Sequence, residues 1–445
     1  MAELESNYKV PAVGIIIDAL HDLVRDKAVE DGMPALRLAF TPTPVGGKTP
    51  VELAAYVAGD DPVSKRPLMP EIVGHLTRPL SDEERKTGQF TRTRKRLIGP
   101  DTAENLQQYF DDRFWTDQLP IVLPTEERVA EMLRHTRHRP DEIVGQIGVC
   151  PWVPCSREEW QYTVETVAIN AVMAGAKPEY FPAILALAAA QTNPRASSTS
   201  SMTAMALFNG PIVTELNMNS GTGALGPYNN AGALVGRSWA LLGGNAIGGS
   251  VPGHTYMGVQ GNPMGFIPAV FAENVTGLPK GWNPFHVQKG FKPDDSVVST
   301  FYGCQSQNTM MVLRDEDWQW VLQRFIGGLG SPNRGGKLLL IDPAVTGPFL
   351  RYGFDTKEKL IEWVKQNVTT PKYHYWLDQE VINYKLAPAR AGQEPYATWL
   401  KLPDDAPIPF LSDVNVVVVG GSGNIRWSVN ECGYSNRSVR VDEWR

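Results

Sequence analysis

The sequence predicts an α/β protein with mixed or parallel sheets that carry helices on both faces, built as a small N-terminal α/β unit and a larger main domain. Three observations lead to this fold class. An apolar run, an amphipathic helical run and a second apolar run follow one another within residues 9–42. The same order recurs near the C-terminus, and a helix between two apolar strands is typical of a parallel pair. Between these parts, apolar helical runs alternate with Gly-rich loops.

The N-terminal unit begins with "VPAVGIIID" (residues 10–18), which predicts a strand. "ALHDLVRDKAVEDG" (19–32) predicts an amphipathic helix that ends at Gly32, and "ALRLAF" (35–40) predicts a second strand. A loop and a further helix follow in residues 41–57. The chain then becomes charged and Pro-containing, which indicates a surface arm or linker. The predicted parts are 1–60 (small α/β unit), 61–140 (charged helical arm or linker) and 141–445 (main α/β domain with Gly-rich pocket loops and a C-terminal βαβ unit).

A pair of apolar helices is expected between residues 156 and 191. Ser156 and Glu159 have the spacing of a capping box at the start of the first helix, and Gly175 ends it. Pro178 suits the first turn of the second helix. The polar residues of the intervening turn, which either bond one another or point into a site, are Lys177, Glu179 and Tyr180.

The C-terminal part predicts a βαβ unit. "GGKLLLIDP" (335–343) is a strand, "DTKEKLIEWVKQNV" (355–368) a helix, and "DVNVVVVGGSGN" (413–424) a hydrophobic strand that runs into a Gly loop. Ligands of open α/β sheets bind at the carboxyl ends of parallel strands, so the loop Gly420–Gly423 is a candidate anion cradle.

The segment 216–272 has an unusual composition. It holds no acidic residue and one basic residue, Arg237, in a protein whose charged fraction is 20%. A solvated face would carry charges of both signs, so the segment is expected to be buried, to line a cavity or to be covered by another subunit. The composition of this segment leaves two interpretations of its role open. The segment is a Gly/Ala-rich core element, or it forms a pocket in which Arg237 attracts a carboxylate.

The same segment contains Gly221-Thr-Gly223-Ala-Leu-Gly226, the spacing of a dinucleotide-binding loop. That site needs a buried strand before the loop and an acidic residue about 20 positions after it. The preceding residues 209–220 make a poor buried strand, and the next acidic residue is Glu273. We therefore predict neither a dinucleotide nor another cofactor.

Four cysteines in 445 residues do not make a disulfide framework, so free thiols are expected. Cys150 and Cys155 are separated by four residues, whereas zinc and thioredoxin motifs prefer two, and no metal site is predicted. The alternative is a redox pair or a thiol nucleophile at Cys150 or Cys155, with Cys304 or Cys432 as resolving partner.

Charge and hydropathy limit the partners. The net charge of −6 argues against nucleic acid, and the basic run 92–96 lies beside acidic stretches. No run of about 18 apolar residues is present, so no membrane span is predicted. The N-terminus has neither a secretory nor a transit pattern, and a cytoplasmic location is expected.

Several strings in residues 140–310 resemble the large domain of the bacterial UGSC-type (seleno)protein family. They are "VAINAVMAGAKPEYFPAIL", "NGPIVTELNMNSGTGALGP", "GALVGR", "QGNP", "AEN" and "HVQKGF", with a weaker similarity at "VVVVGGSGN". Residues 10–47 resemble the latter half of that family's small domain. The family signature, Cys or selenocysteine followed by Gly-Ser-Cys, is expected upstream of this region, so redox chemistry based on it would need a second polypeptide. Asn262 stands where the resemblance predicts His.

The leading functional hypothesis is an enzyme of bacterial catabolism that acts on a small anionic organic substrate by addition–elimination or hydrolysis. His254 is the expected proton carrier, with His286 as second choice, although a structural role for His254 remains open. Glu273 could also move a proton if burial raises its pKa, and Gly-loop N–H groups could stabilise an oxyanion. The candidate catalytic residues are His254, Glu273 and Cys150, and the candidate substrate-binding residues are Lys177, Glu179, Tyr180, Asn219, Ser220, Gly221, Thr222, Arg237, Asn274 and His286.

Two alternatives belong to other classes. One is a thiol-based oxidoreductase that uses Cys150 or Cys155. The other is a non-catalytic subunit of a complex with a small partner that carries the Cys-Gly-Ser-Cys motif. Whichever of the three functions holds, a homo-oligomer is expected, most simply a two-fold dimer, because the charge-poor segment 216–272 needs to be covered.

Overall fold

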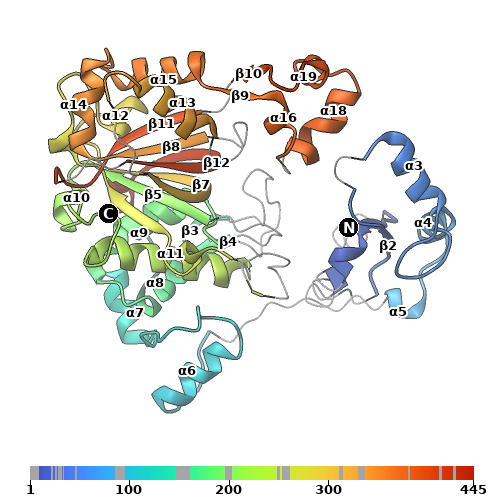
Figure 1. Ribbon diagram of the computed structural model, residues 1–445. Helices are drawn as coiled ribbons and strands as arrows, with labels where there is room; N and C mark the ends of the chain where they lie inside the picture. Colours follow the sequence, from blue (N-terminus) through green and yellow to red (C-terminus); the bar gives the residue numbers. More distant parts are fainter. Residues whose placement is uncertain are drawn as a thin grey trace. The chain divides into compact units, whose positions relative to one another are not determined.

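The computed structural model describes residues 10–21, 24–25, 28, 33, 35–45, 48–85, 96–146, 161–195, 203–247, 251–252, 261–309, 314–328, 336–378, 381–409, 413–423 and 427–445. The chain divides into two compact units. One comprises residues 1–98 and 371–406, and the other comprises residues 99–370 and 407–445. Both contain helices and strands, and the predicted α/β class is confirmed (Figure 1).

The N-terminal part is built on a parallel pair, β1 (Gly14–Ile17) and β2 (Leu38–Thr41), with Gly14 opposite Leu38. The two strands predicted in this unit are therefore present and pair in parallel. The 3-10 turn η1 (Asp18–Leu20) follows β1. The helices after β2 are α3 (Pro50–Ala58), α4 (Leu68–Thr77) and α5 (Asp82–Arg85).

Local sequence explains where these helices lie. Thr49 and Glu52 form a complete capping box at the start of α3, which fixes the predicted loop-to-helix boundary. Leu68 and Ile72 lie one turn apart on α4 and pack against Ala39 of β2. The helix is thereby anchored to the two-stranded sheet by its apolar face.

Residues 371–406 form a short helical segment. Its ends meet where β9 (Thr369–Pro371) pairs with β10 (Pro407–Pro409), and the backbone N–H of Lys372 donates to the carbonyl oxygen of Ala406 at 2.9 Å. Its helices are α16 (Lys372–Tyr375), the π-helical turn η6 (Ile382–Leu386), α18 (Ala387–Arg390) and α19 (Tyr396–Lys401).

The main unit is built on a six-stranded mixed sheet in the order β11-β8-β12-β7-β5-β6. Its strands are β5 (Thr203–Asn209), β6 (Ala269–Ala272), β7 (Val297–Thr309), β8 (Gly336–Ile341), β11 (Val414–Val418) and β12 (Trp427–Arg440). The pairs β8–β11 and β5–β6 are parallel, and the other pairs are antiparallel. The parallel pair predicted at the C-terminus is β8–β11.

Helices flank this sheet. Figure 1 shows α13, α14 and α15 beside β8 and β11, and α8, α9 and α11 on the other side beside β5. The remaining elements of the unit are α6 (Ala103–Asp111), α7 (Glu126–Leu133), β3 (Ile143–Gln146), β4 (Gln161–Thr163), α8 (Val164–Met173), η3 (Pro178–Tyr180), α9 (Phe181–Ala189), α10 (Ile212–Glu215), α11 (Asn230–Ile247), η4 (Pro263–Gly265), η5 (Val275–Gly277), α12 (Phe285–Gln288), α13 (Trp318–Gly328), α14 (Pro343–Arg351), α15 (Lys357–Asn367) and η7 (Val441–Trp444).

The start of α8 differs from the prediction. The helix begins at Val164, and Thr163 caps it through a bond from the backbone N–H of Thr166. Residues 161–163 form strand β4 instead of the helical turn expected after Ser156. The reason is a second capping sequence, Thr163-Val-Glu-Thr166, which lies closer to the apolar stripe of the helix.

The sheet is strongly curved, and one hydrophobic cluster shows it. Phe271 of β6 and Val417 of β11, which belong to the two edge strands, share a buried cluster. The backbone N–H of Asn274, just after β6, donates to the carbonyl oxygen of Val418 at 2.8 Å. The chain just after β6 therefore reaches the end of β11. The cluster contains residues of all six strands, namely Met205, Leu207, Phe271, Phe301, Cys304, Leu338, Leu340, Val417 and Cys432.

Helix α11, in the middle of the charge-poor segment, belongs to the core. On α11, Val235 and Trp239 are buried against the chain's own helices and strands. Gly232 and Gly236 lie so close to β6 that a side chain at either position would overlap the carbonyl oxygen of Val270 or Pro268. This is the close backbone packing of a Gly/Ala-rich core element. Arg237 is the single charged residue that α11 carries.

The prediction of free thiols is wrong for two of the four cysteines. Cys304 of β7 and Cys432 of β12 stand directly opposite each other, with their Cα atoms 4.1 Å apart, and form a disulfide. Neighbours in an antiparallel pair present their side chains on the same face, which brings the sulfur atoms together. The partners are 128 positions apart in sequence, so spacing gave no sign of the pair. Cys150 and Cys155 lie outside the described residues.

Candidate functional site

The two Gly-rich loops singled out from the sequence lie side by side. The backbone N–H of Gly420 donates to the carbonyl oxygen of Ser220 at 2.9 Å. A side chain at Gly421 would overlap Thr222. The amide nitrogen of Asn274 donates to the carbonyl oxygen of Gly420 at 2.8 Å. Three segments that were predicted separately therefore meet just beyond the ends of β6 and β11.

The glycines at this junction serve packing. Gly420 has a φ of +99°, which favours glycine, and a side chain there would overlap a carboxylate oxygen of Asp342. The motif Gly221–Gly226 forms turns, and α11 begins at Asn230 rather than directly after the motif. The loop lacks the strand and helix that a dinucleotide site requires.

Replacing Gly420 by Ala is expected to lower the free energy of unfolding by about 1–3 kcal/mol, because the new side chain would meet Asp342 in a left-handed backbone conformation. Gly423→Ala is the matched control, since a side chain at that position would have no other atom within 4 Å. Urea denaturation measures both variants. Equal stability of the two would contradict the packing role of Gly420.

Glu273 lies in a fully buried ion pair. Its Oε1 is 2.7 Å from Nζ of Lys357, and neither side chain is exposed. Its Oε2 accepts from Nδ2 of Asn209 at 2.7 Å and from the backbone N–H of Phe285 at 2.7 Å. Burial lowers the pKa of Lys357, and the carboxylate of Glu273 opposes that shift. Glu273 thus joins the ends of β5 and β6 to the first residues of α12 and α15.

Arg237 is also held by an internal carboxylate. Its Nε and Nη2 donate to the two carboxylate oxygens of Asp117 at 3.0 and 2.9 Å, and Nη2 donates to the carbonyl oxygen of Pro120 at 2.9 Å. Burial alone would raise the pKa of Asp117, but the bonds and charge of Arg237, with the charge of Arg195, hold it below its usual range. Arg237 is therefore neutralised inside the protein.

The other predicted residues lie in separate places. Lys177 and Glu179 are exposed and pair with each other at 3.8 Å. The hydroxyl of Tyr180 donates to Oδ1 of Asn230 at 3.4 Å. His286 is buried, with Nε2 3.3 Å from the carbonyl oxygen of Pro293. His254 lies outside the described residues. Within the described ranges, no three His, Cys, Asp or Glu side chains are placed to hold a metal ion.

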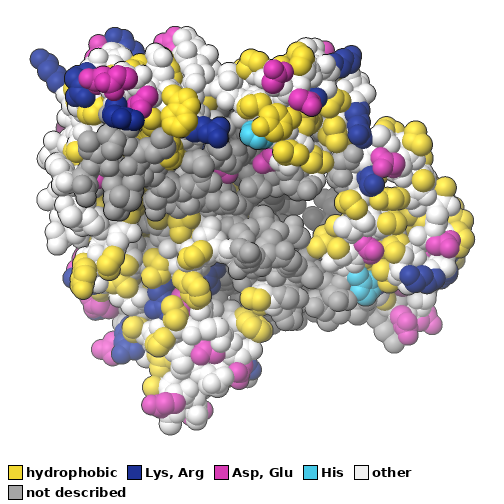
Figure 2. Space-filling model, viewed as in Figure 1, with side chains coloured by type: hydrophobic (Ala, Val, Ile, Leu, Met, Phe, Trp, Pro, Cys, Tyr) yellow, Lys and Arg dark blue, Asp and Glu magenta, His cyan; other side chains and the backbone are white. Residues whose placement is uncertain are grey.

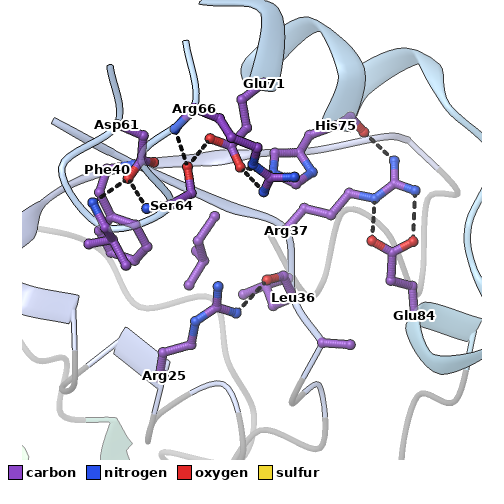
Figure 3. Close-up of a pocket in the computed structure, with 13 residues that line it drawn as sticks. Arg25, Leu36, Arg37, Phe40, Asp61, Ser64, Arg66, Glu71, His75 and Glu84 are labelled. Atoms are coloured by element: carbon purple, nitrogen blue, oxygen red, sulfur yellow. Dashed lines mark hydrogen bonds and ion pairs between the residues drawn. The ribbon is translucent and has the colours of Figure 1, made fainter. Parts of the chain in front are cut away.

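A different group of residues surrounds a cavity in the N-terminal part of the chain. Its volume is about 200 Å³, and its walls come from the residues before β2, from β2, from the turn before α4, and from α4 and α5. Figure 3 shows Arg25 and Leu36 on one side and Ser64, Glu71 and His75 on the other. The lining residues are Arg25, Ala35, Leu36, Arg37, Leu38, Phe40, Asp61, Val63, Ser64, Arg66, Glu71, His75 and Glu84.

Most charges in this wall are already paired. Arg37 is buried and donates from Nε and Nη2 to both oxygens of Glu84, at 3.1 and 3.0 Å, and to backbone carbonyls. Hydrogen bonds from Arg78 and Arg37 lower the pKa of Glu84. Glu71 accepts from Ser64 at 2.5 Å and from Arg66. These ion pairs hold the wall in place, and the charged groups within them already neutralise one another.

Two groups in the wall remain unmatched. The guanidinium of Arg25 donates from Nη1 to the carbonyl oxygen of Leu36 at 3.0 Å, and no carboxylate of the described residues lies within ion-pair distance of it. Neither ring nitrogen of His75 has a hydrogen-bond partner, and Nε2 lies 3.8 Å from Oε1 of Glu71. Burial lowers the pKa of His75 and nearby arginines add to this, whereas Glu71 opposes it. We call this the Arg25–His75 cavity.

Sequence reasoning placed most of these residues in a charged arm and missed the cavity. Two signals were present. Arg37 interrupts the apolar strand "ALRLAF", and a charge in a buried strand needs partners. Glu71 and His75 are four apart in α4, so they lie on one helix face beside the buried residues Leu68 and Ile72.

The chain matches none of the protein-family models and none of the curated proteins with which it was compared. In the part of the chain that the structure describes, no helix has the length and apolar character needed to cross a membrane.

Proposed function

We propose that the protein is a cytoplasmic enzyme of bacterial catabolism that acts on a small anionic organic substrate, by addition–elimination or hydrolysis, in the Arg25–His75 cavity. One observation carries the proposal. A guanidinium without a carboxylate partner among the described residues and an imidazole without hydrogen bonds line the same cavity of about 200 Å³. An open arginine binds a carboxylate, and an unbonded imidazole can accept a proton from the bound molecule.

The chemistry of the two groups is complementary. The lowered pKa of His75 keeps its ring neutral at pH 7, which is the form a general base requires. Once His75 takes a proton, the carboxylate of Glu71, 3.8 Å from Nε2, stabilises the imidazolium. Ser64 donates to Glu71 and not to His75, so the arrangement favours proton transfer over a serine nucleophile.

A panel of small organic acids followed by proton NMR in D₂O tests this function. Wild-type protein is expected to convert at least one acid or to exchange its α-proton. Arg25→Gln is expected to raise KM about 10- to 100-fold, which corresponds to the loss of a charge-assisted hydrogen bond of about 1.5–3 kcal/mol. Arg128→Gln is the control, because Arg128 also donates to a single carbonyl, that of Leu123, but lies outside the cavity. An equal KM in both variants would count against the proposal.

We also propose a homodimer through the exposed part of the charge-poor segment. Leu225, Tyr228, Phe266 and Ile267 are 52%, 100%, 54% and 41% exposed, and no formal charge lies among them. In a two-fold interface a patch meets its own copy, so the absence of charge removes like-charge repulsion.

Light scattering is expected to give twice the mass of one chain. Tyr228→Asp is expected to shift the protein to monomer, because the two-fold axis would bring like charges together. Val275→Asp, at a position 47% exposed in the same unit, is the control. Wild-type protein that stays monomeric at high concentration would rule the dimer out.

A second candidate function has its own support. Within the residues that the structure describes, the sheet of β1 and β2 has two strands, and Val51 of α3 and Met69, Val73 and Leu76 of α4 are exposed. Figure 2 shows hydrophobic side chains gathered over α3 and α4. Two-stranded sheets are marginal alone, so these features favour a partner polypeptide such as the expected Cys-Gly-Ser-Cys subunit. Co-expression with such a subunit, followed by co-purification, tests it.

A further inference from the structure

We infer that the Arg25–His75 cavity selects a monocarboxylate with a compact apolar body, such as an aromatic or branched aliphatic acid. The inference rests on the proposed function and names its substrate class. It combines the shape of the wall, the number of open charges and the volume.

The wall has an apolar part next to the open guanidinium. Leu36, whose carbonyl oxygen binds Arg25, is followed along β2 by Leu38 and Phe40, and all three line the cavity. Ala35 and Val63 complete this part. A ligand whose carboxylate reaches Arg25 therefore places its body against aliphatic and aromatic carbon. Removing apolar surface from water favours such a body by roughly 25 cal/mol per Å².

The charges of the wall favour a ligand that carries a single anionic group. Arg37 is bonded to Glu84, and Arg66 is bonded to Glu71, so Arg25 is the open cation among the lining residues. A second carboxylate on the ligand would face Asp61, Glu71 or Glu84 without a free cation, and like charges at close range repel. A dianion is therefore disfavoured.

The carboxylates of the wall equally argue against a ligand ammonium group. Both oxygens of Asp61 accept backbone N–H groups, from Phe40 at 2.5 Å and from Val63 at 2.7 Å. Glu71 and Glu84 each accept from an arginine. Each carboxylate of the wall is already bonded to donors of the protein, so the ammonium group of an amino acid would lose its solvation with little compensation.

The volume sets the size of the body. Apolar cavities of about 150 Å³ hold a benzene molecule. The Arg25–His75 cavity, at about 200 Å³, therefore accommodates one ring together with a carboxylate. A fused ring system or a long chain exceeds it.

Isothermal titration calorimetry with four probes tests the inference: benzoate, benzyl alcohol, phenylalanine and succinate. Benzoate is expected to bind at least about tenfold more tightly than each of the others, which corresponds to about 1.4 kcal/mol. Arg25→Gln is expected to abolish the preference for benzoate over benzyl alcohol. Val63 lines the cavity and is 39% exposed, so Val63→Ser is expected to weaken the binding of benzoate while the protein still folds.

The outcomes separate the two proposals. Succinate or phenylalanine binding as tightly as benzoate, with dependence on Arg25, overturns the apolar monocarboxylate and leaves the proposed function standing. Failure of all three acids to bind overturns both. Benzoate binding that is unchanged in Arg25→Gln places the ligand elsewhere and also overturns both.

Discussion

Replacing His75 by Gln is expected to lower kcat by about 10²–10⁴-fold, the usual contribution of a general base. Gln keeps a polar side chain in the wall but cannot accept the proton. Because no hydrogen bond fixes the ring of His75, the variant removes no structural partner and is expected to fold. His135→Gln is the matched control, since His135 is exposed on α7's C-terminal side. A kcat that falls equally in both variants, or in neither, would contradict the role of His75.

The pH profile gives a second signature of the same group. The pKa of His75 in the folded protein is below its ordinary value of 6.5. Activity should therefore persist below pH 6.5 and fall as the pH drops through the lowered pKa, because the protonated ring is no longer a base. The unfolded chain binds the proton more tightly than the folded one, so the stability contributed by the neutral ring declines over the same acidic range.

Replacing Glu273 by Gln is expected to lower the free energy of unfolding by about 3–5 kcal/mol, because Lys357 would remain charged in a buried site without its partner. The other contacts add to the effect, since the new amide places an N–H group near donors from Asn209 and Phe285. Glu362→Gln, on the exposed side of α15, is the control and is expected to change stability little.

Urea denaturation, followed by the fluorescence of the tryptophans in the main unit, measures both glutamate variants. A loss below about 1 kcal/mol in Glu273→Gln would mean that Lys357 finds another partner or loses its proton at little cost. That result would contradict the structural role assigned to the pair. Retained catalytic activity in a folded Glu273→Gln protein would agree with the role, because both carboxylate oxygens are occupied by protein donors.

Local patterns predicted the fold well. The apolar runs of β1, β2, β8 and β11 were predicted as strands, and the helix between the last two gave the parallel pair β8–β11, since chain order and strand hydrophobicity determine such pairing. The charge-poor segment was predicted to be buried or covered, and α11 is indeed core. The glycines of α11 allow its backbone to approach β6 closely. The sequence alone does not show that α11 packs on β6, so it could not explain these glycines.

The polar partners could not be predicted, because each is distant in sequence. Glu273 meets Lys357 across 84 positions, and Arg237 meets Asp117 across 120. The sequence suggested substrate binding for Arg237 and proton transfer for Glu273, because their internal partners were not visible in it. The cavity was missed for a related reason. Arg25 and His75 come from separate helical runs and reach the same cavity because Arg25 bonds to the carbonyl oxygen of Leu36, just before β2, and α4 packs on β2.

The most direct test of a small-acid site in the N-terminal part is ¹⁵N NMR of histidine-labelled protein titrated with benzoate. We expect the ring signals of His75, assigned with His75→Gln, to shift saturably, and Arg25→Gln to remove the shift. Saturable binding that moves the signals of other histidines and leaves those of His75 unchanged would contradict the account.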